Sequence, residues 1–259
     1  MARILITGSS DGLGLMAGRL LVEQGHAVVL HARSEARAVD ARQALPDAEA
    51  VIVGDVSALA AMHNVAAQAN ATGRFDAVIH NVGLGYKEPD RAVTEDGLSR
   101  LWAVNVLAPY VLTALVRRPD RLVYLSSGMH TGADASLDDV QWERRRWDGA
   151  QAYSETKLHD VWLAFGIARL WPNVPSNAVS PGWVATRMGG RGANDDLDQA
   201  HRTQAWLAAG DEADASVTGR FLYHRSPGRL SEPASDERLQ NDLLAYCASV
   251  SGIALPDAK

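Results

Sequence analysis

Short apolar runs alternate with longer stretches of mixed polarity along this chain. The apolar runs are rich in Val, Ile and Leu and have the length of β-strands; they cover residues 4–6, 28–30, 51–53, 77–79, 122–125, 176–180 and 219–223. The stretches between them have helical length and spacing; they cover residues 12–25, 34–44, 58–71, 95–104, 106–117, 151–170 and 235–250. Apolar strands that alternate with helices indicate a parallel sheet covered on both faces. We therefore expect an α/β fold with a doubly wound parallel sheet of about seven strands.

Two segments interrupt this rhythm, residues 128–150 and residues 183–218. Each follows a predicted strand, and ligands of parallel α/β folds bind outside the carboxyl ends of the strands. We expect both segments to border a ligand site, with 183–218 as a mobile lid, although two surface loops that pack only locally are the alternative. The basic run at 144–146 is expected to be a solvated helix face.

Composition narrows the class of protein. The chain has 259 residues, of which 47% are hydrophobic and 22% charged, as in a globular protein with one domain over residues 1–259. The net charge of −6 disfavours nucleic-acid and anionic-membrane partners. The one cysteine, Cys247, allows no internal disulfide and fits a reducing, cytoplasmic environment. The sequence shows neither a signal segment nor an apolar run of membrane-spanning length.

A glycine-rich turn joins the first strand to the first helix. Gly8, Gly12 and Gly14 have the spacing Gly-x3-Gly-x-Gly, with Ser10 and Leu13 among the residues between them. Glycines let a backbone approach a ligand closely, and a helix N-terminus offers free N–H groups to a phosphate. The turn therefore predicts a site for the pyrophosphate of a dinucleotide; a tight turn without a ligand is the alternative.

The end of the second strand indicates which dinucleotide is preferred. In such folds an acidic residue at this point binds the ribose 2′-hydroxyl of NAD. Here the position is Ala32, and Arg33 follows, whose guanidinium suits a 2′-phosphate. We expect NADP(H) to be preferred and NAD(H) to be possible, unless Arg33 is only a solvated surface residue. Asp11 in the glycine turn argues against this preference, because its negative charge would not favour a nearby phosphate. His31 is expected to fill space.

Further segments follow in order along the chain. They are Gly54-Asp55-Val56, His80-Asn81-Val82-Gly83, Val104-Asn105-Val106, Ser126-Ser127, Tyr153-x3-Lys157 and the segment from Asn177 to Thr186 with Pro181, Gly182 and Val184. Together with the glycine turn they resemble the short-chain dehydrogenase/reductase family over essentially the whole chain. Ser127 and Tyr153 are 26 positions apart, which exceeds the usual spacing of the family and is similar to that of its retinol-dehydrogenase-like branch.

This resemblance implies a single-domain Rossmann-type fold and a set of cofactor contacts. The implied cofactor-binding residues are Gly8, Ser10, Gly12, Leu13, Gly14, Arg33, Asp55, Val56, Asn81, Gly83, Tyr153, Lys157, Pro181, Gly182, Val184 and Thr186. The implied catalytic residues are Asn105, Ser127, Tyr153 and Lys157, with Asn105 fixing a water of the proton relay. The resemblance also implies a homodimer or homotetramer built through the two central helices. Trp162 and Phe165 are then candidate interface residues, or else they face the sheet.

The chemistry of carbonyl reduction explains these residue types. A carbonyl needs a hydride on carbon and a proton on oxygen; the nicotinamide supplies the first and a protein acid supplies the second. Tyr153 and Lys157 lie one helical turn apart, so the ammonium can lower the pKa of the phenol. Ser127 would hold the substrate oxygen, and we prefer it to Ser126. An amphipathic helix face is the alternative interpretation of the pair.

Other residues give weaker signals. The histidines lack the spacing of metal ligands, and we predict no metal site. His130 could line the pocket, but a loop histidine facing water is favoured. The large side chains of the later segment could form an apolar wall or belong to the core; they are Trp183, Met188, Trp206, Phe221 and Tyr223.

We therefore predict an NADP(H)-dependent oxidoreductase for a small-molecule carbonyl or alcohol. A non-catalytic dinucleotide-binding sensor or scaffold is the main alternative, and the presence of Ser127, Tyr153 and Lys157 together argues against it. An epimerase or dehydratase is disfavoured because only a short stretch follows Gly182.

Overall fold

The computed structural model describes residues 1–257, except for the side chains of residues 213 and 214, so the last two residues of the predicted 1–259 domain lie outside the described residues. The strands are β1 (Arg3–Ile6), β2 (Ala27–Ala32), β3 (Ala50–Val53), β4 (Ala77–His80), β5 (Arg121–Leu125), β6 (Ser176–Ser180), β7 (Phe221–Tyr223) and β8 (Ser226–Pro227). The α-helices are α1 (Gly12–Glu23), α2 (Glu35–Ala44), α3 (Leu59–Thr72), α4 (Arg100–Trp102), α5 (Ala108–Leu115), α6 (Gly149–Leu170), α7 (Leu197–Ala200), α8 (Arg202–Ala209) and α9 (Glu237–Ser251). Shorter helical turns are η1 (Ala103–Leu107), η2 (Gly128–Gly132), η3 (Ala213–Ser216) and η4 (Glu232–Ser235).

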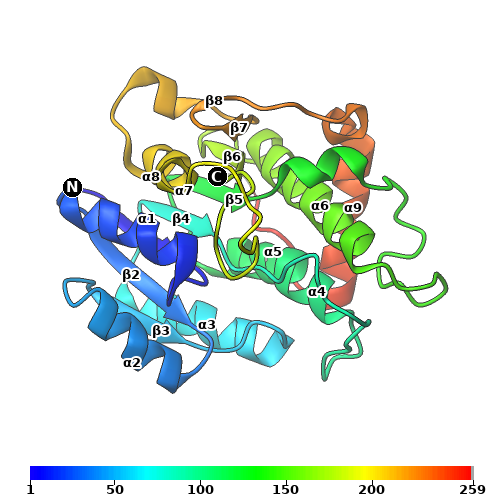
Figure 1. Ribbon diagram of the computed structural model, residues 1–259, viewed down its shortest axis with the longest axis horizontal. Coiled ribbons are helices and arrows are strands. Elements are labelled where there is room, and N and C mark those ends of the chain that lie inside the picture. The colour runs from blue at the N-terminus through cyan, green and yellow to red at the C-terminus, as the bar shows by residue number, and fades with distance from the viewer. Residues whose placement is uncertain (258–259) are drawn as a thin grey trace.

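The strands join in one twisted sheet (Figure 1). Their order is β3-β2-β1-β4-β5-β6-β7-β8, with parallel pairing throughout except for the β7–β8 hairpin. The predicted doubly wound parallel sheet is confirmed, and the two-residue strand β8 is an addition to the expected seven. The strand order reverses between β1 and β4, which opens a crevice at the carboxyl ends of these neighbouring strands.

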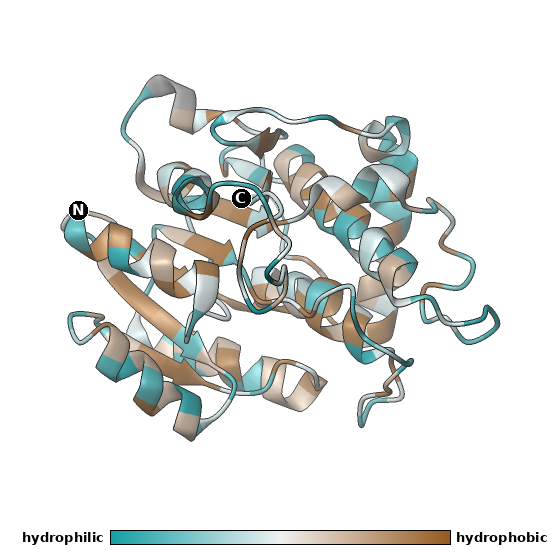
Figure 2. Cartoon of the chain, in the orientation of Figure 1, coloured by the Kyte–Doolittle hydropathy of each residue, from teal (hydrophilic) through white to brown (hydrophobic). Residues whose placement is uncertain are grey.

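Helices cover both faces of the sheet. One apolar cluster joins Leu5, Val29 and Val78 of the strands to the buried sides of α3, α5, α6 and α9. The alternate strand residues, such as Ile4 and Val28, pack with α1, α2 and α8 on the opposite face. This alternation follows from the period of two along a strand. In Figure 2 the strands are accordingly hydrophobic while the outer helices are mixed.

Two predicted helical segments differ from the structure. Residues 95–99 do not continue the predicted helix, because Gly97 adopts a positive φ of 79° in a turn and Val93 forms an isolated bridge with Ser99. From residue 100 to 115 the chain is helical without a break, and it passes through the π-helical turn η1 between α4 and α5. The run 144–146 is not a helix face either, because it lies in turns that fold back on α6.

Helix α6 lies inside the protein over most of its length. Asp148 caps its first turn by accepting from the N–H groups of Ala150 and Gln151, and every residue from 152 to 167 is buried. Helix α9 and the turn η4 pack along it (Figure 1). Trp162 is fully buried and donates its indole N–H to Pro233 O at 2.8 Å, and Phe165 is 9% exposed. Both residues therefore belong to the apolar core on this side of the sheet, as in the second of the two alternatives, and not to an exposed interface.

Within residues 1–257, no helix combines the length and the apolar character needed to cross a bilayer.

Candidate active site

The glycine turn lies in the crevice between β1 and β4. Gly8 has a φ of +60°, and a Cβ on it would stand 2.7 Å from the Cα of Val82. A Cβ on Gly14 would stand 2.5 Å from the amide nitrogen of Asn81 and 2.8 Å from Gly8 O. Both positions therefore require glycine. Asn81 fixes the turn to β4 by donating to Thr7 O and Gly8 O at 3.0 and 2.9 Å.

His31 supports the turn from β2, a role that the sequence did not reveal. Its Nδ1 accepts from the N–H of Gly8 at 3.0 Å, so its Nε2 carries the proton and donates to Gly54 O at 2.9 Å. Burial lowers the pKa of His31, which keeps this tautomer neutral. The ring thus fills space, as expected, and it also sets the spacing between the glycine turn and the end of β3.

An unexpected arginine lies beside the turn. Arg37, on the first turns of α2, reaches Asp11 at 2.6 Å, Ser10 at 3.4 Å and Asp40 at 2.8 Å. The predicted Arg33 is exposed at the end of β2. From the sequence, Asp11 was expected to be unfavourable for a nearby phosphate. In the structure its charge is paired with the guanidinium of Arg37. Arg37 could have been noticed in the sequence because it lies four residues after Arg33, so that both arginines lie near the start of the same helix.

Residues at the ends of β3 and β4 enclose the rest of the crevice. Val56 is buried, and Asp55 is exposed and accepts from the N–H of Ser57 at 3.1 Å. A Cβ on Gly83 would lie 3.5 Å from Asn105 Oδ1 and 3.7 Å from Lys157 Nζ. The segment after β4 therefore runs between the glycine turn and the predicted catalytic residues.

Tyr153 and Lys157 lie on one side of α6, beneath the end of β5. Lys157 donates from Nζ to Leu125 O at 2.8 Å and to Asp160 Oδ2 at 2.7 Å, and its Nζ is 5.5 Å from the centre of the Tyr153 ring. The Tyr153 hydroxyl faces the sulfur of Met188 at 3.9 Å. The acidic partner Asp160 was not among the residues singled out from the sequence.

The two adjacent serines have different environments. Ser126 is buried and donates to Lys157 O at 2.6 Å, so its hydroxyl holds α6 to β5. Ser127 is half-buried and lies close enough to Tyr153 to lower the pKa of the phenol. His130 is fully buried rather than water-facing, because its Nδ1 contacts Ser127 O at 2.7 Å and its ring packs on Phe221.

Asn105 lies in the π-helical turn η1. Its side-chain oxygen accepts from the N–H of Leu84 at 2.7 Å, and its amide donates to Leu84 O at 3.1 Å and to Thr156 Oγ1 at 3.0 Å. Wide turns of this kind are frequent at functional sites. Asn105 thereby fastens the 81–99 segment to α6 next to Lys157.

The segment after β6 completes the edge of the crevice. Pro181 is followed by Gly182 at a φ of +86°, and the N–H of Trp183 donates to Asp195 Oδ2 at 2.6 Å. Val184 is buried, and the hydroxyl of Thr186 accepts from Gly189 N–H at 3.2 Å.

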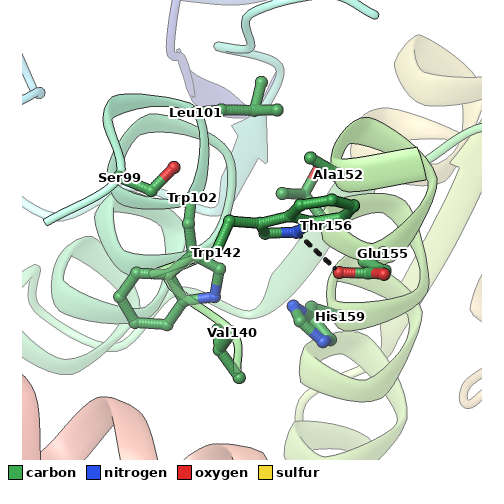
Figure 3. A pocket seen from close by; sticks show the side chains of 9 residues that line it. All are labelled: Ser99, Leu101, Trp102, Val140, Trp142, Ala152, Glu155, Thr156 and His159. Atoms are coloured by element: carbon green, nitrogen blue, oxygen red, sulfur yellow. Dashed lines mark hydrogen bonds between the residues drawn. The ribbon is translucent and has the colours of Figure 1, made fainter. Parts of the chain in front are cut away.

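Apolar and aromatic side chains surround Tyr153. Trp142, Leu101 and Ala152 form a buried cluster with it, and further side chains pack on this cluster: Leu84, Tyr86, Met129 and Trp147. Trp142 donates its indole N–H to Glu155 at 2.9 Å (Figure 3). The insertion 128–150 therefore borders Tyr153.

Glu155 also binds the basic run at residues 144–146. Arg145 bonds Glu155 at 2.9 Å and lies over the Trp142 ring at 3.9 Å. Arg145 thus holds the insertion on α6 although its side chain is 32% exposed, whereas Arg144 and Arg146 are exposed, as expected for the run.

The members of the predicted aromatic wall lie in different places. Met188 contacts Tyr153, and Tyr223 lies beside Gly182, where a Cβ would stand 3.2 Å from its ring, whereas Trp183 is 48% exposed. Trp206 and the largely buried Phe221 line a groove of about 720 Å³ with Arg220 and Arg225 near β7 and β8.

The charges of the site are coupled. Burial raises the pKa of Tyr153, Lys157 opposes this rise, and Asp160 adds to it. Burial disfavours the charged form of Lys157, but Asp160 and Tyr153 together raise its pKa. Burial also raises the pKa of Asp160 to about 7, although Lys157 limits this rise. Lys157 thus lowers the pKa of the phenol, as expected, but in the protein alone burial and Asp160 leave the pKa of Tyr153 above its usual value.

Among the described residues, no three His, Cys, Asp or Glu side chains gather as they would around a metal ion.

Comparisons with known proteins place this site in a family. A sequence profile of the short chain dehydrogenases matches residues 2–128. The chain is 43% identical to the uncharacterized oxidoreductase AN7799 of Emericella nidulans, with 99% of each chain covered. It is 40% identical to the short-chain dehydrogenase chyC of Penicillium rubens, with 99% of this chain and 100% of that one covered.

Solved structures share the fold. An uncharacterized protein from Mycobacterium paratuberculosis superposes with a TM-score of 0.83 at 24% identity, covering 99% of this chain and 95% of that one. A blue fluorescent protein from a metagenomic library, in complex with NADPH, superposes with a TM-score of 0.69 at 22% identity, covering 86% and 95%. The sheet order, the glycine turn and the full-length relatives lead to one conclusion: the chain belongs to the short-chain dehydrogenase family of oxidoreductases.

Proposed function

We propose that this protein is an NADP(H)-dependent carbonyl reductase or alcohol dehydrogenase in which Tyr153 gives and takes the proton. The observation that carries this proposal is the position of Tyr153, 5.5 Å from the Lys157 ammonium and beside Ser127, at the sheet edge where the glycine turn lies. Active sites combine a proton donor with groups that stabilise charge on the reacting oxygen. This arrangement supports a catalyst more than a passive dinucleotide sensor.

The residues of the crevice fit a nicotinamide dinucleotide, because the turn excludes a Cβ at Gly8 and Gly14 and presents the N-terminus of α1. When bound, this cofactor supplies or accepts the hydride. Its pyrophosphate would lie on the glycine turn at Gly12 and Leu13. Asp55 and Val56 would border the adenine, Asn81 and Gly83 the adjoining ribose, and Lys157 the second ribose. The carboxamide would meet Pro181, Gly182, Val184 and Thr186.

Three side chains favour the phosphorylated cofactor. Ser10, Arg33 and Arg37 lie at the end of β2 and over the glycine turn, where the 2′-phosphate of NADP would lie. A guanidinium binds a phosphate through two charge-assisted hydrogen bonds. Ala32 is buried and offers no carboxylate to a 2′-hydroxyl. The NADPH complex of the blue fluorescent protein shows that a protein of the same fold accepts the phosphorylated cofactor.

The roles of the protein residues follow from their contacts. In reduction Tyr153 donates the phenol proton to the carbonyl oxygen, and in oxidation the phenolate takes it from the alcohol. Ser127 donates a hydrogen bond to the same oxygen. Lys157 stabilises the phenolate, and Asn105 holds the neighbouring segment and α6 together. Burial keeps the phenol protonated in the free protein, which suits a proton donor.

The surroundings of Tyr153 indicate the type of substrate. Tyr86 packs edge-on against the phenol ring with centroids 5.9 Å apart, and Met188, Met129 and Trp147 lie on the same side. A wall of this kind favours a carbonyl carried by an apolar or aromatic body. The substrate must displace Met188 to reach the hydroxyl.

The test uses a panel of aromatic and aliphatic ketones, aldehydes and alcohols, with NADPH and NADH consumption followed by absorbance. We expect Tyr153→Phe to lower kcat by roughly 10²–10⁴-fold, the usual contribution of acid–base catalysis. The Kd for NADPH and the melting temperature should change little, because the ring remains in place.

Tyr86→Phe is the matched control, since Tyr86 also lies at the site and donates to Gly189 O. Its kcat should stay within a few-fold of the wild-type value. A Tyr153→Phe protein with more than about a tenth of wild-type activity would exclude this role for Tyr153.

A further inference from the structure

Asp160 is a buried carboxylate that the proposed reaction does not use. It lies one helical turn after Lys157 on α6, and the side chains of the pair are only 3% and 5% exposed. Its Oδ2 is 2.7 Å from Lys157 Nζ, which at the same time donates to Leu125 O at the end of β5. The ammonium is therefore held between the sheet and a carboxylate of its own helix.

A buried ion pair needs an explanation, because burying two charges is unfavourable and apolar residues often serve as well. Asp160 does not serve the insertion 128–150, since Glu155 is the α6 carboxylate that binds Arg145 and Trp142. The position of the pair points to the active site instead. Lys157 Nζ lies 5.5 Å from the centre of the Tyr153 ring, so whatever balances the ammonium also acts on the phenol.

The groups that face the pair from other elements add little charge of their own. Tyr124 on β5 faces Asp160, and His80 on β4 stacks on Tyr124 with centroids 4.7 Å apart. Burial raises the pKa of Tyr124 and lowers the pKa of His80 to about 3, so both are neutral at pH 7. The amide of Asn105 on η1 and the phenol of Tyr86 face the site from the other side.

Residues on α6 itself complete these surroundings. Burial lowers the pKa of His159, next to Asp160, to about 3. The charge of Glu155 is taken up by Arg145. Asp160 is therefore the carboxylate that balances Lys157.

We infer that Asp160 is a positioning residue that holds the Lys157 ammonium against Leu125 O and, by balancing its charge, keeps Tyr153 in the protonated form that donates to a carbonyl. This inference rests on the proposed function of Tyr153. An unbalanced ammonium would favour the phenolate and hence alcohol oxidation, whereas the balanced pair favours carbonyl reduction up to a higher pH. The sequence Tyr-x3-Lys-x2-Asp thus tunes the direction in which the site works best.

The experiment compares the wild type with Asp160→Asn, which keeps the shape and an oxygen for Lys157 but removes the charge. The quantity measured is kcat/KM for carbonyl reduction from neutral to alkaline pH. We expect the alkaline fall of this profile to begin roughly one pH unit lower in Asp160→Asn, as for the loss of one nearby charge. The rise of alcohol oxidation with pH should move down by a similar amount. Asp160→Glu, which restores a carboxylate, should return the profile toward that of the wild type.

Glu155→Gln is the matched control, because it neutralises another buried carboxylate of α6 that contacts Arg145 rather than Lys157. Its alkaline limb should coincide with the wild-type limb. If Asp160→Asn does not fold, Asp160→Ser removes the same charge with a smaller side chain.

Two outcomes overturn the inference: an alkaline limb that stays in place in the neutral variant, or a fall in kcat that is uniform across pH, which would indicate a purely structural role. Either outcome leaves the proposed function intact as long as Tyr153→Phe is inactive. An active Tyr153→Phe protein would instead refute the proposed function itself.

Discussion

Two histidines are enclosed in the protein as neutral rings. His80 and His159 are each 2% exposed, and burial lowers the pKa of each to about 3. The unfolded chain binds a proton at each ring below about pH 6.5, whereas the folded protein does not until about pH 3. Because the unfolded state binds more protons between these values, stability must fall as the pH falls through this window.

His159→Phe tests this argument. The wild type should lose stability between pH 7 and pH 5, and the variant should lose about 2 kcal/mol less, the contribution of one such histidine. The free energy of unfolding in urea at both pH values is the measurement. His63→Phe is the control, because His63 is exposed on α3. Parallel losses in the wild type and in His159→Phe would show that His159 is protonated in the folded state.

The choice of cofactor is tested at two arginines. Arg33→Ala and Arg37→Ala should each raise the Kd for NADPH by one to two orders of magnitude, about 1.4–3 kcal/mol for a lost charge-assisted pair, and should barely change the Kd for NADH. Arg42→Ala on the last turn of α2 is the control and should leave both constants unchanged. The measurement is a fluorescence titration. A wild-type protein that binds NADH more tightly than NADPH would contradict the proposed preference.

Local spacing in the sequence predicted part of the site and missed another part. The glycine turn and Tyr153-x3-Lys157 are local patterns, so they could be recognised without coordinates. Arg37 acts through a contact with Asp11 of another element, which no local pattern reveals. Asp160 contacts Lys157 of its own helix, but a charged residue in a helical sequence gives no local sign that it is buried. The two serines were ranked by pattern, and the structure adds that Ser126 donates to Lys157 O, which leaves Ser127 facing the phenol.

At the scale of elements, hydrophobic runs predicted the sheet better than the insertions. The strands and most helices could be predicted from the spacing of the apolar residues and from the length of each run. The turn at 95–99 and the π-helical turn at Asn105 could not, because contacts of the 81–99 segment hold them: Arg100 N–H donates to Ala92 O, and Leu84 N–H donates to the side chain of Asn105. The run 144–146 has the charge of a solvated helix, yet Arg145 is fixed by Glu155 and Trp142 through contacts that no local pattern encodes.

The segment 183–200 contacts both the glycine turn and Tyr153, and we propose that it acts as a lid. Arg187 reaches Asp11 of the glycine turn at 3.6 Å, and Met188 lies on Tyr153. Both contacts lie where cofactor and substrate would bind, so ligands must rearrange them. We expect NADPH to slow hydrogen exchange in 183–200 together with residues 8–14, while α3 stays unchanged as an internal control. Protection of 8–14 with unchanged exchange in 183–200 would mean that this segment is not a lid.

At the scale of the whole molecule, the C-terminal segment covers the two central helices. Besides the Trp162 contact with Pro233, Tyr110 on α5 donates its hydroxyl to Ile253 O at 2.8 Å. Gly166 of α6 lets α9 approach, since a Cβ there would stand 2.9 Å from Leu244. The face through which the resemblance implied a dimer or tetramer is therefore occupied by the chain itself.

This covered face predicts the oligomeric state. Among the exposed large apolar side chains of the described residues, Val39 on α2, Val93 in the 81–99 segment and Leu170 at the end of α6 lie on different elements, and Trp183 and Met188 share the segment after β6. Such a set offers little contiguous apolar surface for a stable interface. We now expect a monomer, with the mass of one chain, 27.8 kDa, in light scattering at micromolar concentration. A chain that ends before α9 would expose α5 and α6, and it should associate or aggregate through them. A full-length dimer whose α6 amides become protected from hydrogen exchange on association would contradict this expectation, because α9 would then have to leave its place.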